Sequence, residues 1–158
     1  MTFITIGQYF NKLQIVFVVL LIMPLLAFIA LYTFAQAASA ETSTEYYTVI
    51  PGVALLEWLF GLITFDKKIK SARNAQGLAA KLDKYFFATI VRSGFLASAS
   101  LVLAAGYFLT RNEAFTGLYL VSVFLSLIFW PTGPKVAGEL RLKGDEREMI
   151  YFKKDKFS

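Results

Sequence analysis

The chain of 158 residues contains no cysteine and no histidine, and these two absences exclude several kinds of chemistry. Without cysteine the chain forms no disulfide, no thiolate nucleophile and no iron–sulfur cluster. Without histidine it lacks the commonest protein metal ligand and the commonest general base. Glycine-rich phosphate loops are absent too, so no nucleophile, base and oxyanion site come together. The sequence therefore predicts a protein that is not an enzyme and that holds no metal or cofactor.

Hydrophobic residues make up 57% of the chain, and they are gathered into four long runs. The runs are between 17 and 26 residues long and cover residues 13–38, 48–65, 85–109 and 114–130. A helix needs about 20 apolar residues to cross a hydrocarbon core about 30 Å thick. We therefore predict an all-α fold over residues 1–158, a single membrane domain. It is expected to be an antiparallel bundle of four transmembrane helices, with short cytoplasmic interfacial helices and a basic tail over residues 131–158.

The fourth run has recognisable ends. Asn112 stands just before it and is a candidate N-cap, because its side-chain oxygen accepts from the first backbone N–H groups of a helix. Trp130 and Pro131 end the run, and tryptophan is typical of the aromatic belt at a membrane surface, so we predict an interface anchor there. In the tail, residues 145–152 begin with acidic side chains, which favour the start of another short helix.

The N-terminal segment carries two further features. Ile6, Phe10 and Leu13 recur at helical spacing and predict a short helix lying on the membrane surface before the first run. Residues 38–40, Ala-Ser-Ala, match the small-residue cleavage site of a signal peptide. Since the apolar part of a signal peptide is usually about 7 to 15 residues long, we expect this longer run to remain as a transmembrane helix, with cleavage as the alternative.

The basic residues predict the orientation in the membrane. The segment between the first two runs holds two glutamates and no basic residue, whereas the tail holds seven basic residues. The segment between the second and third runs holds six, namely Lys67, Lys68, Lys70, Arg73, Lys81 and Lys84. Because basic loops stay in the cytoplasm, both termini are predicted to be cytoplasmic in a bacterial inner membrane. The six residues are expected to face anionic lipid headgroups, and no nucleic acid is expected as a partner.

Two charged side chains lie well inside apolar runs. Glu57 is eight residues from Phe65 and Arg92 is seven residues from Tyr85, so both are about 10 to 12 Å from the cytoplasmic end of their runs. An ionised side chain at the centre of a membrane helix costs about 2.5–3.5 kcal/mol. We therefore predict an ion pair between Glu57 and Arg92. It is either a structural contact that holds two helices together or a proton or substrate site.

The third run also contains a pattern of small residues. Small side chains let helices approach closely in lipid, where packing drives helix association. The pattern permits two interpretations: packing within the chain's own bundle, or contact with a helix of a partner. Its members are Ser93, Gly94, Ala97, Ser98, Ser100 and Ala104.

Several short motifs carry a resemblance to known sequences. They are Tyr9-Phe10-x-Lys12-Leu13, Lys81…Tyr85…Ile90…Arg92, Leu109-Thr110-x-Asn112, Pro131-Thr132-x-x-Lys135 and Leu140-x-Leu142. Together they resemble a group of short, uncharacterised bacterial membrane proteins with four helices. That group often has an acidic residue shortly after the arginine of the third span. Here the stretch from Gly94 to Ser98 has none, and Glu57 would supply the missing charge. The resemblance implies a topology and no activity, because the group has no assigned activity.

The expected function is that of a non-enzymatic scaffold or accessory subunit. Its partners are the bilayer, with anionic headgroups on the cytoplasmic side, and another membrane protein or a second copy of this chain. The alternative is a small homo-oligomeric transporter or channel that uses the Glu57–Arg92 pair.

Overall fold

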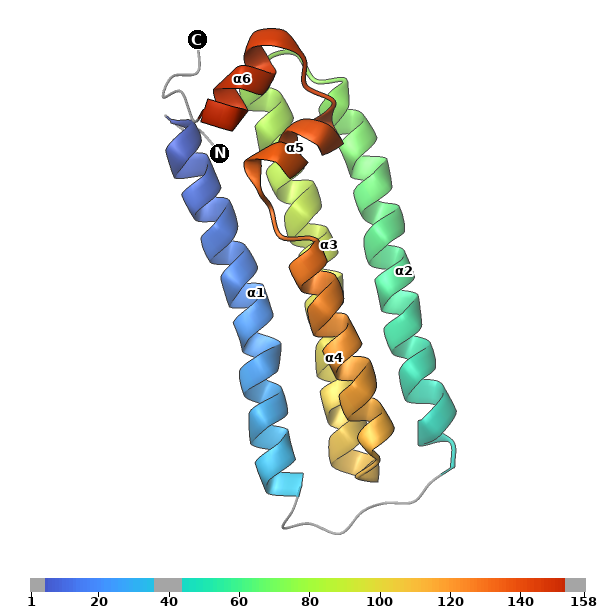
Figure 1. The fold of residues 1–158 in the computed structure, drawn as a ribbon. Helices are drawn as coiled ribbons and strands as arrows, with labels where there is room; N and C mark the ends of the chain where they lie inside the picture. The colour runs from blue at the N-terminus through green and yellow to red at the C-terminus, as the bar shows by residue number, and fades with distance from the viewer. Residues whose placement is uncertain (1–4, 36–43, 153–158) are drawn as a thin grey trace.

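The computed structural model describes residues 5–35 and 44–152 of the chain (Figure 1). In these two ranges the chain forms six helices and no strand, so the predicted all-α fold is confirmed. The helices are α1 (Ile6–Ala35), α2 (Tyr46–Arg73), α3 (Leu78–Thr110), α4 (Glu113–Ile128), α5 (Gly133–Leu140) and α6 (Gly144–Phe152).

The longest helix, α3, is the centre of the bundle. Helices α1, α2 and α4 each pack along it, while α1 and α2 hardly touch each other (Figure 1). Both described ends of the chain lie at the end of the bundle that α5 and α6 cover. One face of α3, between α1 and α2, is therefore left without a covering helix.

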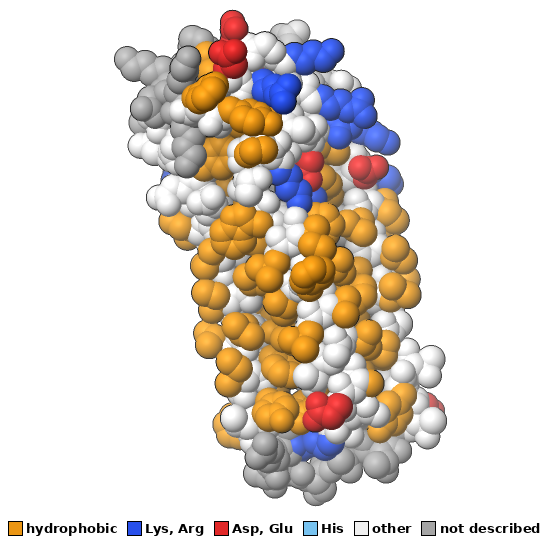
Figure 2. Space-filling model, viewed as in Figure 1, with side chains coloured by type: hydrophobic (Ala, Val, Ile, Leu, Met, Phe, Trp, Pro, Cys, Tyr) orange, Lys and Arg blue, Asp and Glu red, His pale blue; other side chains and the backbone are white. Residues whose placement is uncertain are grey.

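Three helices, α1, α2 and α3, are long and apolar enough to cross a membrane. Helix α4 has 16 residues, which amounts to about 24 Å and is less than the usual thickness of the hydrocarbon core. Together α4 and α5 pass the same test as one broken span, bent by 80°, so the chain has three candidate spans or up to four. Figure 2 shows hydrophobic side chains covering the length of the bundle and most of the visible lysine and arginine near α5 and α6.

The helices extend further than the apolar runs. Helix α2 continues eight residues beyond Phe65 to Arg73, and α3 begins at Leu78, seven residues before the predicted start. The expected surface helix at the N-terminus is not a separate element, because α1 is continuous from Ile6 onwards. Its first turns are buried by protein rather than laid on lipid, since Ile6 and Leu13 belong to a core built with α3, α5 and α6.

The tail forms the two short helices α5 and α6, and their predicted place at the membrane surface stays a prediction. Both helices fold back over the end of the bundle, and their apolar side chains complete its core. The tail residues buried there are Val136, Ala137, Leu140, Leu142 and Ile150. Burial of these apolar side chains stabilises the contact between the tail and the ends of the long helices.

Local signals in the sequence are confirmed where the structure describes them. The Asn112 side chain accepts a hydrogen bond from the backbone N–H of Ala114 at 2.8 Å, so it is the N-cap of α4. Asp145 and Glu146 stand in the first turn of α6. The Ala-Ser-Ala site of residues 38–40 lies outside the described residues.

Hydrogen bonds between side chains join α2, α3 and α4 near the middle of the bundle. Trp58 of α2 donates its indole N–H to the Ser122 hydroxyl of α4 at 3.2 Å, and this hydroxyl is 2.8 Å from that of Ser100 in α3. Hydrogen bonds between helices in an apolar environment contribute about 0.6 kcal/mol each on average. They fix which faces of α2, α3 and α4 meet, and thereby which face of α3 remains open.

Candidate functional site

Arg92 is the most deeply buried charge of the described chain. It lies on α3 with 1% of its surface exposed. Its guanidinium is placed between two aromatic rings, with Cζ 3.7 Å from the ring centre of Phe65 and 4.4 Å from that of Phe129. A cation over an aromatic face is stabilised by the ring quadrupole, and more strongly when water is excluded. The rings therefore compensate part of the cost of burying this charge.

Glu139 of α5 is the ion-pair partner of Arg92. One carboxylate oxygen accepts from Arg92 Nη1 at 3.4 Å, and the other accepts from the Tyr85 hydroxyl at 2.5 Å. The backbone carbonyl of Glu139 accepts from Arg73 Nε of α2 at 2.7 Å. One residue of α5 is thus held by side chains from both α2 and α3.

The predicted ion pair between Glu57 and Arg92 is not formed between these two described residues, so that prediction is wrong. The Ser98 hydroxyl donates to Glu57 at 2.8 Å, six residues further along α3 than Arg92. Gly61 of α2 is also placed against α3 beyond Arg92, because a Cβ added to it would lie 2.9 Å from the Cβ of Phe95.

The reason is the register of α2 against α3. The prediction assumed that Phe65 and Tyr85, the adjoining ends of two apolar runs, lie at the same height along the bundle axis. Instead both helices continue, and the turn between them is asymmetric, so that Lys84 donates to Ser71. Six residues of helix correspond to about 9 Å of rise and about 240° of rotation. Glu57 and Arg92 therefore differ in both level and direction.

Glu57 lies in a small cavity on the open side of α3. The cavity has a volume of 320 Å³ and is lined by Glu57 together with Val91, Gly94, Phe95 and Ser98. One oxygen of the carboxylate accepts from Ser98, while the other is buried and has no hydrogen-bond partner in the described structure. A buried acceptor without a partner costs about 1–3 kcal/mol, and more when it is charged. Glu57 is therefore an incompletely satisfied group.

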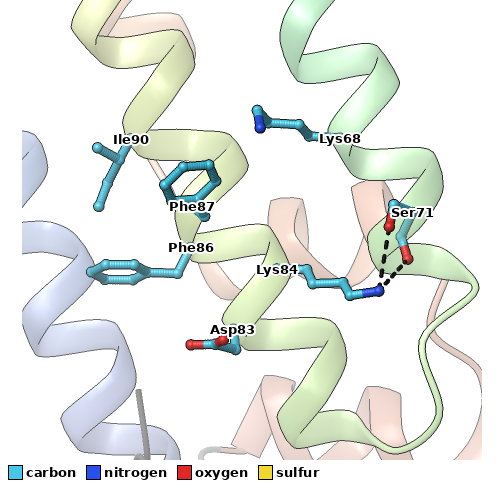
Figure 3. A pocket seen from close by; sticks show the side chains of 7 residues that line it. All are labelled: Lys68, Ser71, Asp83, Lys84, Phe86, Phe87 and Ile90. Carbon is cyan, nitrogen blue, oxygen red and sulfur yellow. Dashed lines mark hydrogen bonds between the residues drawn. The ribbon is translucent and has the colours of Figure 1, made fainter.

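The open face of α3 follows a regular helical spacing. Its residues recur at alternating steps of four and three and are Phe87, Val91, Gly94, Ser98, Leu101 and Ala105. A Cβ added to Gly94 would meet nothing within 4 Å, so the chain's own packing does not require glycine there. Near the end of the bundle that α5 and α6 cover, the same face opens into a cavity of 550 Å³, whose walls include Lys68 of α2 and Phe87 of α3 (Figure 3). We call this surface the α1–α2 groove.

The small residues predicted as a packing set divide between two faces. Ser93, Ser100 and Ala104 are buried within the bundle. Gly94 and Ser98 line the cavity at Glu57, and Ala97 is partly exposed. The set therefore serves internal packing on one side of α3 and leaves small side chains on the open face.

Of the six basic residues expected at the lipid surface, four contact other parts of the protein and the remaining two are exposed. Arg73 bonds to α5, and Lys81 forms an ion pair of 2.6 Å with Glu146 of α6. Lys68 stands over the Phe87 ring, and Lys84 donates to Ser71 of α2 (Figure 3). Lys67 and Lys70 are exposed, and for these the contact with headgroups stays a prediction.

The predicted interface anchor at the end of α4 makes protein contacts. The Trp130 ring packs edge-on against Phe17 of α1 with ring centres 5.1 Å apart, and Pro131 is buried.

Sequence reasoning missed Glu139, which pairs with Arg92. The available signal was a single acidic residue on a short apolar helix after Pro131, with Thr132 accepting a bond from Lys135 N–H as its N-cap.

These observations define a class of protein. It is all-α, several of its helices are long and apolar enough to cross a membrane, and it carries a carboxylate and a guanidinium on separate faces of those helices. Among the described residues, no group of three or more acidic side chains is placed to hold a metal ion. Comparisons with protein-family models, with curated proteins and with solved structures gave no match.

Proposed function

We propose that the chain is an accessory membrane subunit that binds a transmembrane helix of another membrane protein in the α1–α2 groove. The observation that carries the proposal is the open face of α3, which presents Gly94 and Ser98 beside the incompletely satisfied carboxylate of Glu57. Small residues permit close approach of a second helix, and a polar group in lipid favours a helix that supplies its hydrogen bond. A partner helix with a lysine, arginine, asparagine or glutamine at the level of Glu57 fits both features.

A second copy of this chain fits the groove less well. Two copies inserted in the same direction, related by a twofold axis along the membrane normal, would bring both Glu57 side chains to one depth. Like carboxylates at one site cannot both stay ionised without a large cost. The proposed occupant is therefore a different protein, and homodimerisation is a result that would contradict the proposal.

The proposed topology has four crossings, with both termini in the cytoplasm of a bacterium. Support comes from the basic residues, which flank the α2–α3 turn and fill the tail, whereas the α3–α4 turn holds only Arg111. Helix α4 is short for a full crossing, and a short span is accommodated by local thinning of the bilayer.

Single cysteines test this topology without interference, because the chain has none of its own. We expect Glu113→Cys, at the exposed first residue of α4, to react with a membrane-impermeant maleimide in intact cells. Gln76→Cys, in the exposed turn before α3, is expected to react only after the membrane is permeabilised. The reverse pattern would show that the orientation is inverted, and labelling of both would contradict the four crossings.

Gly94→Leu is expected to abolish partner binding while leaving the chain folded. The Cβ of a leucine there meets nothing within 4 Å, and the rest of its side chain would occupy the groove. Steric overlap in a packed contact costs roughly 1–3 kcal/mol, which corresponds to a loss of about 5- to 150-fold in affinity. The measurement is the amount of partner that remains bound after purification in mild detergent, weighed by native mass spectrometry.

Gly117→Leu is the matched control, because Gly117 lies on α4 and is equally free of neighbours. A photocrosslinking residue at Leu101, on the open face, should give one defined adduct, and the same residue at the exposed Phe124 of α4 should give none. Equal adducts at both positions would refute the groove as the binding site. A lone monomer or homo-oligomer in native membranes would instead favour the transporter alternative, with Glu57→Gln as its first test.

A further inference from the structure

A second groove lies between α2 and the α4–α5 bend. Apolar side chains line one end of it and charged side chains line the other. It has a volume of 440 Å³. Leu62 and Ile63 form its apolar part, and they are 41% and 50% exposed. One to three turns further along α2, Asp66 and Arg73 line its charged part, with Arg92 and Glu139 opposite. Figure 2 shows acidic and basic side chains together where the hydrophobic surface ends.

The arginines of this groove have unused hydrogen-bond donors. Arg92 is almost fully buried, and its Nε and Nη2 have no partner in the described structure. Within residues 5–35 and 44–152 its one ion-pair contact, from Nη1 to Glu139, is long at 3.4 Å, whereas charge-assisted bonds of this kind are usually about 2.7–2.9 Å. Arg73 uses Nε for the Glu139 carbonyl, so its planar terminal pair of nitrogens remains available at the rim.

From this arrangement we infer that the groove between α2 and α5 binds the phosphate headgroup of a phospholipid. Guanidinium groups match phosphate oxygens with two parallel hydrogen bonds, and Arg73 and Arg92 bring two such groups to one groove. Leu62 and Ile63 provide an apolar path for an acyl chain directly below. The charge of Glu139 is offset by its ion pair with Arg92, and its second oxygen accepts from the Tyr85 hydroxyl. The other carboxylate of the groove, that of Asp66, is exposed.

The apolar part of the groove is the reason for assigning a lipid rather than free phosphate. A free phosphate ion would contact only the charged end of the groove and leave Leu62 and Ile63 exposed. A phospholipid would cover the charged and the apolar ends together. The groove is separate from the α1–α2 groove, which lies on the other side of α2 and α3. Its occupation therefore does not depend on the proposed accessory function.

Native mass spectrometry of the full-length protein tests the inference. The protein is released from detergent micelles that contain phosphatidylglycerol and phosphatidylethanolamine, and bound phospholipid is counted. We expect one retained phospholipid for the native chain. Retention should fall about tenfold in Arg73→Gln, which removes the charged donors, and in Ile63→Trp, which fills the apolar part of the groove.

Lys70→Gln and Leu59→Trp are the matched controls, because both residues are exposed on α2 and neither lines the groove. They should retain phospholipid as the native chain does. Ile63→Trp keeps every charge, so it tests the site even where Arg73→Gln loosens α5. Equal retention in all five proteins would overturn the inference. Thermal stabilisation by millimolar inorganic phosphate without any retained phospholipid would show that free phosphate is the ligand and would overturn the lipid assignment.

Discussion

Glu139→Ala is expected to lower the free energy of unfolding by about 3–5 kcal/mol, the range for removing one partner of a buried ion pair. The loss is large because Arg92 stays buried without its ion-pair partner, and Tyr85 loses its acceptor. Since Glu139 also holds α5 to side chains of α2 and α3, the packing of α5 and α6 against the ends of the bundle should loosen. The measurement is the denaturant midpoint in mild detergent, combined with hydrogen exchange of the amides in α5.

Glu148→Ala is the control, because Glu148 is an exposed acid of the tail. A double variant, Arg92→Met with Glu139→Leu, should recover much of the stability, since a buried ion pair replaced by apolar residues of similar size is often neutral. If Glu139→Ala and Glu148→Ala unfold at the same midpoint, the pair with Arg92 does not stabilise the fold.

Gly106→Leu is expected to lower the free energy of unfolding by about 3 kcal/mol, at the upper end of the usual cost of overpacking. A Cβ added to Gly106 would lie 2.6 Å from Phe115 of α4 and 2.9 Å from Ile50 of α2. Both neighbours are held by the bundle, so α3 would have to separate from two helices at once. Helix content by circular dichroism should persist, while the thermal midpoint falls.

The comparison variant is Gly52→Leu, because a Cβ at Gly52 meets nothing within 4 Å. Its midpoint should stay close to that of the native chain. Equal midpoints for the two variants would mean that α2, α3 and α4 do not approach as closely at Gly106 as the structure has them.

Much of the secondary structure followed from local chemistry. The apolar runs predicted the long helices, because a run of apolar residues of that length has few other stable conformations in lipid. Asn112 marked the start of α4, since capping depends on residues two to three positions away. The acidic residues at 145 and 146 marked the start of α6 for the same reason.

The candidate sites did not follow from local chemistry. The pairing of Glu57 with Arg92 was predicted from their distances to the ends of the apolar runs. The contact of Ser98 with Glu57 showed a different register, because the turn after Arg73 is asymmetric. Nothing near either charge in the sequence reports the shape of that turn.

The sequence by itself determined which segments are helices and where the basic residues stand relative to the apolar ones, because both depend on neighbouring residues. Only the tertiary structure decided that Arg92 pairs with Glu139 of the tail and that Glu57 is left beside an open face of α3. The physical reason is that helix register and the docking of α5 arise from packing between residues far apart in the chain. Such packing depends on how the surfaces of two helices fit together. A shift of one helix by one turn against its neighbour changes the contact partner of every residue between them.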